Sequence, residues 1–212
     1  MSIDALKDAV CENVERYAPA LVDASHDIHA RPELGFEERH ACALLSRRAA
    51  DAGLDVEVGA YGLPTSFRAR AGDGPGPHVI VCCEYDSLPD LGHACGHNVI
   101  AAAGLGAGLA LAPLAARLGG RLTLLGTPAE EGGGGKVVLL ERGAFDGAAA
   151  VLLVHPATSD VVLPPLRAAT RFRATFHGRA AHTGIAPEQG RNALDALVLA
   201  YQATNALRSS IV

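Results

Sequence analysis

The chain has 212 residues, which is enough for one large domain or for one domain and part of a second. Hydrophobic residues make up 49% and charged residues 19%, a balance typical of a globular protein rather than a disordered one. The formal net charge is -5 and aromatic residues are only 4%, so the sequence offers neither a basic patch nor a row of stacking rings. We therefore expect no nucleic-acid partner.

Three features of the sequence favour a cytoplasmic protein without a membrane partner. Residues 1–20 include Lys7 and Arg16 and lack the continuous apolar centre of a signal peptide. The apolar run at residues 99–116 is broken by glycines and by Pro113, which favours a buried helix over a membrane span. The five cysteines are an odd number, which argues against a disulfide framework. Four of them are interpreted as small buried hydrophobic residues, namely Cys11, Cys42, Cys82 and Cys83.

The spacing of apolar residues predicts two helices at the start of the chain, over residues 4–29 and 36–52. Pro19 is expected to interrupt the first helix. The second has Glu37 and Glu38 in its first turn and Gly53 just after its end. Strands are then predicted over residues 54–58, 66–70 and 79–83, with a turn at residues 72–77.

Helices and strands alternate in the next part of the chain. The pattern predicts helices over residues 97–118 and 135–141 and strands over residues 121–125 and 148–154. Such alternation favours an α/β fold with a mixed central sheet flanked by helices. Functional sites in such sheets gather at the ends of strands, so the residues that follow each strand are candidates for a site.

Pro164 and Pro165 mark a predicted boundary between a first domain, residues 1–165, and a second, residues 166–212. In the second domain, residues 170–177 alternate as a strand, and residues 191–207 form an amphipathic helix with Asn192 and Asp195 near its start. One strand and one helix cannot bury a core by themselves. We therefore expect the second domain to be incomplete.

Three groups of side chains after these strands could carry chemistry. Cys95 and His97 are two residues apart between glycines, and a thiolate and an imidazole are good zinc ligands, although the triplet by itself also fits a packed loop. Glu130 and Glu131 are adjacent carboxylates that would repel each other unless a metal or solvent relieved the cost. His155 follows a buried strand, as do the candidate ligands Glu84 and Asp86. His182 lies in a loop of the second domain and has no local partner for metal binding.

The order of these motifs resembles the family of aminoacylases, hippurate hydrolases, auxin-conjugate hydrolases and p-aminobenzoyl-glutamate hydrolases, which are co-catalytic metallopeptidases. The match starts at residues 31–38, passes through Gly-His-Ala-Cys-Gly-His and Pro-Ala-Glu-Glu-Gly-Gly-Gly, and ends at residues 190–193. Residues 84–89 and 130–136 look closest to the dipeptidase-like branch. The resemblance implies a zinc-exopeptidase-like first domain and the start of a small ferredoxin-like α+β lid that forms a homodimer.

The resemblance also implies a site with two divalent metal ions, Zn²⁺ above Mn²⁺ or Co²⁺. Cys95 would bridge the two metals, and His97, Glu131 and His155 would be further ligands. The expected activity is hydrolysis of an amide bond in an N-acyl amino acid or a dipeptide-like substrate.

The resemblance also implies four roles other than metal binding. Glu130 would be the general base, and Asp86 would orient a metal ligand. His182 would stabilise the tetrahedral oxyanion in the site of the other protomer, and Asn192 would help to bind the substrate carboxylate.

This chain departs from the family pattern in length. Family members are longer and return to the first domain with a segment that supplies one more histidine ligand, so we expect impaired activity in the 212-residue chain itself. Two alternatives stay open. One is a catalytically impaired fragment, or a metal- or partner-binding module, that needs a second chain; the other is a structural α/β domain without metal.

Overall fold

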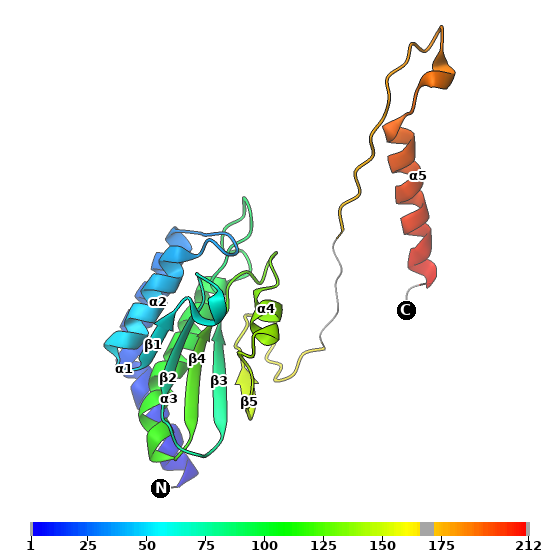
Figure 1. Ribbon diagram of the computed structural model, residues 1–212. Coiled ribbons are helices and arrows are strands. Elements are labelled where there is room, and N and C mark those ends of the chain that lie inside the picture. Colours follow the sequence, from blue (N-terminus) through cyan, green and yellow to red (C-terminus); the bar gives the residue numbers. More distant parts are fainter. Residues whose placement is uncertain (1, 166–171, 211–212) are drawn as a thin grey trace. The chain divides into compact units, whose positions relative to one another are not determined.

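The computed structural model describes residues 2–165 and 172–210 (Figure 1). The chain divides into two compact units, Met1–Asp160 and Val161–Val212. The division into a catalytic domain, residues 1–165, and the start of a lid domain, residues 166–212, stays a prediction.

A mixed sheet of five strands forms the centre of the first unit, within the residues described (Figure 1). In chain order the strands are β1 (Asp55–Val58), β2 (Phe67–Ala71), β3 (His78–Cys83), β4 (Arg121–Gly126) and β5 (Ala150–Leu152). Their order across the sheet is β1-β2-β4-β3-β5. Strand β3 pairs in parallel with β4 and β5, and β2 pairs in antiparallel fashion with β1 and β4. The predicted α/β class with a mixed sheet is confirmed.

Helices cover both faces of this sheet, because the central strands are apolar on both sides. In chain order the helices of the first unit are α1 (Ile3–Ala30), α2 (Arg39–Asp51), α3 (His97–Arg117) and α4 (Gly135–Glu141), with the short 3-10 turn η1 (Ala60–Gly62). Val81 and Cys83 of β3 belong to the core under α1, α2 and α3. Ile80 and Cys82 alternate with them and belong to the core that includes Leu139 of α4.

Helix α3 is long and apolar enough to cross a membrane by composition alone, but 56% of its most apolar window is buried inside the protein. Its glycines explain how close it lies to the sheet. A Cβ on Gly104 would lie 2.5 Å from the Cys83 sulfur, and one on Gly108 would lie 3.2 Å from Leu124. The predicted buried helix is therefore the central helix of the first core.

Two sequence predictions about helices α1 and α2 are wrong. Pro19 lies inside an uninterrupted α1, because long-range packing outweighs the local cost of a proline: the Asn13 amide donates a 3.1 Å hydrogen bond to the Ala110 carbonyl of α3. Helix α2 begins at Arg39 rather than at Phe36, since Phe36 has a left-handed backbone with φ 66°. Glu38 is consequently the N-cap residue, and its side chain is buried.

The cysteine prediction is confirmed for three residues and wrong for one. All five cysteines are free, and Cys42, Cys82 and Cys83 are buried. Burial raises the pKa of Cys42 to about 12 and that of Cys82 to about 11. Cys11 is exposed, because it lies on a part of α1 that faces solvent.

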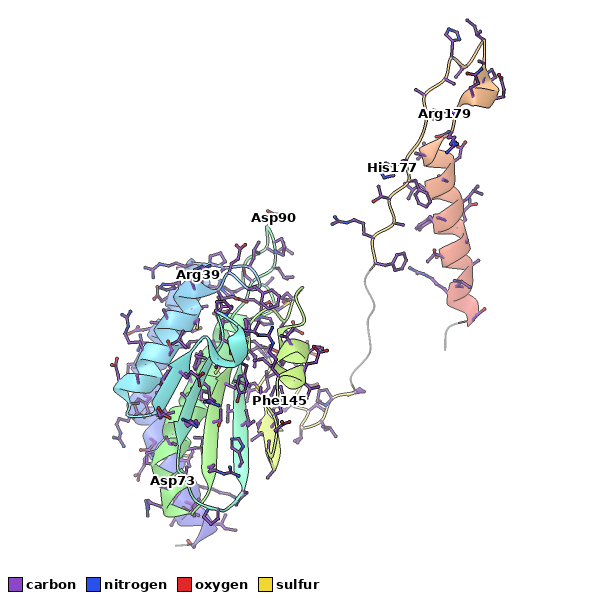
Figure 2. The ribbon with its side chains drawn as sticks, in the orientation of Figure 1. Arg39, Asp73, Asp90, Phe145, His177 and Arg179 are labelled. Carbon is purple, nitrogen blue, oxygen red and sulfur yellow. The ribbon has the colours of Figure 1, made fainter. Side chains whose placement is uncertain are left out.

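The second unit contains helix α5 (Ala193–Ala206), preceded by η2 (Pro187–Gln189) and followed by η3 (Leu207–Ser210). Figure 2 shows His177 and Arg179 in the extended segment that precedes η2. The predicted strand at residues 170–177 is wrong for residues 172–177, which have no regular secondary structure; residues 170 and 171 lie outside the described residues. Within this unit's described part, the one bridge joins Arg179 to Arg191, so the alternating segment has no strand to pair with.

Candidate metal centre

Polar side chains gather where the three parallel strands end. Glu84 and Asp86 follow β3, the turn after β4 carries Glu130 and Glu131, and His155 follows β5. The carboxyl ends of parallel strands meet at one edge of a sheet, which brings these residues to the same region.

His97 is the centre of this region. It is the first residue of α3 and only 1% exposed. Its Nδ1 donates to the Asp86 carboxylate at 3.0 Å, and the other Asp86 oxygen accepts the Glu131 backbone N–H at 2.9 Å. This hydrogen bond leaves Nε2 as the ring nitrogen with a free lone pair. Nε2 lies 3.5 Å from Glu84 Oε2 and 3.7 Å from Glu131 Oε1.

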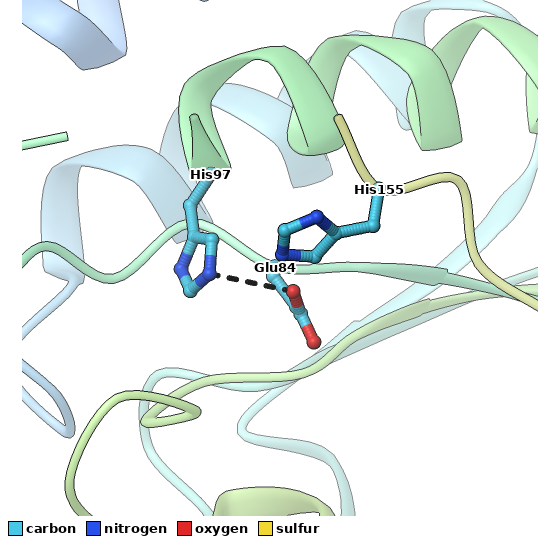
Figure 3. Close-up of side chains that lie close together, drawn as sticks. All are labelled: Glu84, His97 and His155. Carbon is cyan, nitrogen blue, oxygen red and sulfur yellow. Dashed lines mark ion pairs between the residues drawn. The ribbon is translucent and has the colours of Figure 1, made fainter. Parts of the chain in front are cut away.

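Two groups of side chains have the geometry to hold a metal ion, and they share His97. One consists of Glu84, His97 and His155 (Figure 3), and the other of His97, Glu130 and Glu131. Within each group the ligand atoms all lie within 4.8 Å of one another. The ring of His155 meets that of His97 edge-on, with centroids 6.2 Å apart. Nδ1 of His155 donates to the Pro156 carbonyl at 2.8 Å, which again leaves Nε2 available.

Two orphaned atoms show that a divalent cation fits these residues. Glu84 Oε2 and His97 Nε2 are buried and have no hydrogen-bond partner among the residues described. Unpaired buried polar atoms are costly, and a cation bound between them would satisfy both. Burial alone would lower the pKa of His97, but the hydrogen bond and charge of Asp86, with the charges of Glu84 and Glu131, raise it. A metal ion would therefore compete with a proton for this imidazole.

Cys95 lies beside the centre but outside both groups of ligand atoms. It is exposed in the loop before α3. A hydrogen bond to the Glu131 side chain, partial desolvation of the sulfur and the negative charges of Glu131, Glu130 and Asp86 raise the pKa of the Cys95 thiol to about 11. Without a cation the thiol therefore stays protonated at neutral pH, and a metal-bridging role for Cys95 stays a prediction.

The turn that carries Glu130 and Glu131 is held by the buried Glu38 carboxylate at the start of α2. Glu38 Oε1 accepts the Ala129 backbone N–H at 2.8 Å. Ala129 has a left-handed backbone with φ 57°, an uncommon conformation for a residue with a Cβ, immediately before Glu130. A side chain 91 residues earlier thus fixes the backbone that presents the two carboxylates.

Replacing Glu38 with Gln should change stability in a pH-dependent way. Burial raises the pKa of Glu38 from its ordinary 4.5, although backbone N–H groups oppose the rise. The folded state therefore holds this proton more tightly than the unfolded state. Its contribution to stability is complete below the unfolded pKa and is lost as the pH rises through the folded pKa.

Glu38→Gln is neutral at every pH and still accepts the Ala129 N–H, so we expect a higher unfolding temperature than wild type at pH 7. The gain should shrink as the pH approaches about 4, near the ordinary glutamate pKa. Circular dichroism melts at both pH values would measure this. Exposed Glu37→Gln is the matched control. A gain of equal size at the two pH values would contradict the assignment.

The other two predicted site residues lie in the second unit. His182 is exposed, and its Nδ1 accepts the Gly184 backbone N–H at 3.2 Å. Asn192 is the N-cap of α5, where its side chain accepts the Leu194 N–H at 2.9 Å. The oxyanion role of His182 and the substrate role of Asn192 stay predictions.

The ligand and catalytic residues predicted from the sequence do not include Glu38 or Lys136, and they leave Glu84 without a defined role. Glu84 stands out by its place directly after β3, but its burial and its ion pair with Lys136 depend on α4, 52 residues away. The role of Glu38 is hidden in the sequence because the pattern places it inside a helix, where an acidic first turn is ordinary.

An α/β domain with histidine and glutamate side chains at the carboxyl ends of parallel strands, two of them orphaned and buried, has the features of a metal-dependent hydrolase domain. Residues 83–196 match the model of Peptidase family M20/M25/M40, and the chain belongs to this family.

Curated relatives agree with this family membership. The chain is 39% identical to mouse Xaa-Arg dipeptidase over 223 residues, covering 99% of this chain and 52% of that protein. It is 31% identical to a p-aminobenzoyl-glutamate hydrolase polypeptide of Escherichia coli, covering 98% of this chain and 46% of that protein. The chain thus spans about half the length of the curated relatives it matches.

Solved structures agree with the fold. An aminobenzoyl-glutamate utilization protein from Klebsiella pneumoniae is 24% identical with a TM-score of 0.66, covering 87% of this chain and 57% of that one. A dinuclear metal-binding peptidase of the M20 family from Bacillus subtilis is 25% identical with a TM-score of 0.57, covering 65% of this chain and 42% of that one.

Proposed function

We propose that this chain supplies the metal site of a hydrolase that cleaves the amide bond of an N-acyl amino acid or a dipeptide-like substrate. The observation that carries the proposal is the buried His97–Asp86 pair, whose free Nε2 faces the carboxylates of Glu84, Glu130 and Glu131. The names of the relatives, a dipeptidase and a p-aminobenzoyl-glutamate hydrolase, support an amide substrate.

Each residue of the centre has a proposed task. His97, Glu131, His155 and Cys95 would hold the divalent metal ions, and Asp86 fixes the His97 ring. Imidazole and thiolate ligands favour Zn²⁺, although the carboxylates also admit Mn²⁺ or Co²⁺. When bound, such an ion lowers the pKa of water toward ~7 and polarises the amide carbonyl.

Glu130 is the proposed general base, and its exposure supports the choice over Glu131. The Glu130 side chain is 43% exposed and that of Glu131 is 14% exposed. The more exposed carboxylate can reach an incoming water and pass its proton to the leaving amine, while the more buried one is better placed to be a ligand.

The proposal also covers the oligomeric state of the protein and its location in the cell. Helix α5 carries a stripe of exposed apolar residues at helical spacing, Leu194, Leu197, Val198 and Tyr201. Such a stripe supports a homodimer contact through the second unit. In this proposal His182 stabilises the oxyanion in the site of the other protomer, and Asn192 helps to bind the substrate carboxylate. The free cysteines support a reducing, cytoplasmic location.

The test is to measure the metal content of the purified protein by mass spectrometry and its hydrolysis of a panel of N-acyl amino acids and dipeptides. We expect close to two metal ions per chain and loss of metal in Cys95→Ala. A chelator should abolish whatever amide hydrolysis the chain retains. Exposed Cys11→Ala is the matched control and should keep its metal. Hydrolysis that persists after complete metal removal would contradict the proposal.

A further inference from the structure

Glu84 is the most deeply buried carboxylate beside the proposed metal ligands, apart from Asp86. It follows β3 directly and is only 3% exposed. Its two oxygens have different surroundings. Oε1 accepts an ion-paired hydrogen bond from Lys136 of α4, whereas Oε2 is buried and has no hydrogen-bond partner in the described chain. The pairing with Lys136 thus accounts for one oxygen and leaves the other unexplained.

The distance from Oε2 to His97 indicates what the second oxygen does. Oε2 lies 3.5 Å from His97 Nε2, which is too long for a good hydrogen bond. Two ligand atoms that each lie about 2.1 Å from a tetrahedral zinc ion are about 3.4 Å apart. The spacing of the two orphaned atoms therefore fits a shared cation better than it fits a direct contact.

A third side chain faces the same point. Figure 3 shows the side chains of Glu84, His97 and His155 directed toward one another. They come from the residue after β3, the first residue of α3 and the segment after β5. One ligand atom from each lies within 4.8 Å of the others. Three protein ligands from three separate parts of the chain is the number that catalytic zinc sites use.

We propose that Glu84 binds a metal ion through Oε2, together with His97 and His155, and that Lys136 holds Oε1 so that Oε2 keeps this orientation. The inference rests on the proposed function and adds a carboxylate to its ligand set. Lys136 also offsets part of the negative charge that Glu84, Glu130, Glu131 and Asp86 place around the centre. It is a positioning residue, since its ammonium contacts Glu84 and has no lone pair for a metal.

The test compares Co²⁺ and Zn²⁺ binding by wild type, Glu84→Gln and the control Glu141→Gln, which is exposed on α4. Calorimetric titration gives the affinity, and the visible spectrum of the Co²⁺ form reports the ligand set independently of activity. Outer-shell partners cost about 10–100-fold in metal affinity when removed. We expect Glu84→Gln to lose more than ~100-fold and to change the Co²⁺ spectrum. The control should match wild type.

Three outcomes would overturn the inference, and they separate it from the proposed function. Wild-type affinity and spectrum in Glu84→Gln would remove Glu84 from the ligand set and leave the proposed function intact. Failure of wild type to bind either metal would overturn both. If circular dichroism shows that Glu84→Gln does not fold, a wild-type crystal soaked in Zn²⁺ replaces the variant. Anomalous scattering then shows which side chains are bonded to the zinc ion. A zinc peak bonded to Glu84 Oε2 supports the inference, and a peak bonded to His97 but not to Glu84 overturns it.

Discussion

Glu130→Gln should lower kcat/KM for the best amide substrate by about 10²–10⁴-fold, because an amide cannot accept the proton of the attacking water. The change keeps the size of the side chain. It should leave metal binding unchanged, because Glu131 is the more buried of the two carboxylates and the one proposed as a ligand. Steady-state kinetics beside metal analysis of the same sample measures both effects.

Two comparisons make the Glu130 result specific. Glu141→Gln makes the same chemical change at an exposed position of α4 and should retain wild-type kinetics. Glu131→Gln should lose metal together with activity. If Glu130→Gln turns over substrate at close to the wild-type rate, Glu130 is not the base.

Gly135→Ala should destabilise the protein by about 3 kcal/mol, the upper end of the usual range for forcing atoms into a packed site. A Cβ at Gly135 would lie 1.8 Å from the Pro128 carbonyl oxygen, and a backbone atom cannot move away as the end of a side chain can. The Gly135 N–H also closes the turn through a 3.1 Å hydrogen bond to the Ala129 carbonyl. Any movement there displaces Glu130 and Glu131, so metal binding should weaken too.

Gly132→Ala is the matched control from the same glycine run. A Cβ there meets nothing within 4 Å, and its backbone φ is not positive, so the change should stay within about 0.5 kcal/mol. Denaturant unfolding of both variants measures the difference. Equal midpoints would mean that the turn after β4 rearranges freely and does not hold the carboxylates in place.

The sequence predicts those parts of the fold that local patterns determine. Strand β3 is a mostly apolar run that begins directly after Pro77, and β4 begins directly after Gly120. The predicted ends of each strand lie within one residue of the observed ends. The predicted bounds of helix α4 match the observed ones. Because the parallel strands end at one edge, the gathering of Glu84, Glu131 and His155 near His97 also follows from the pattern.

Features that depend on distant contacts could not be predicted in this way. Helix α1 continues through Pro19 because α3 supports it. Phe36 leaves the helical region, and the buried Glu38 side chain bonds the distant Ala129 N–H instead of capping α2. The segment at residues 172–177 has the alternation of a strand, but alternation cannot supply a pairing partner. The Glu84–Lys136 pair joins a strand end to a helix that no short motif connects.

The close approach of α3 to the sheet has a consequence for recognising working members of this family. Gly104 takes no part in chemistry, yet a methyl group there would lie 2.5 Å from the Cys83 sulfur and 2.8 Å from the Cys82 carbonyl oxygen. The helix would have to move away from β3 and carry His97, its first residue, away from Glu84. A chain with every metal-binding motif intact but alanine at this position would therefore pass a motif search and still lack the geometry of the centre.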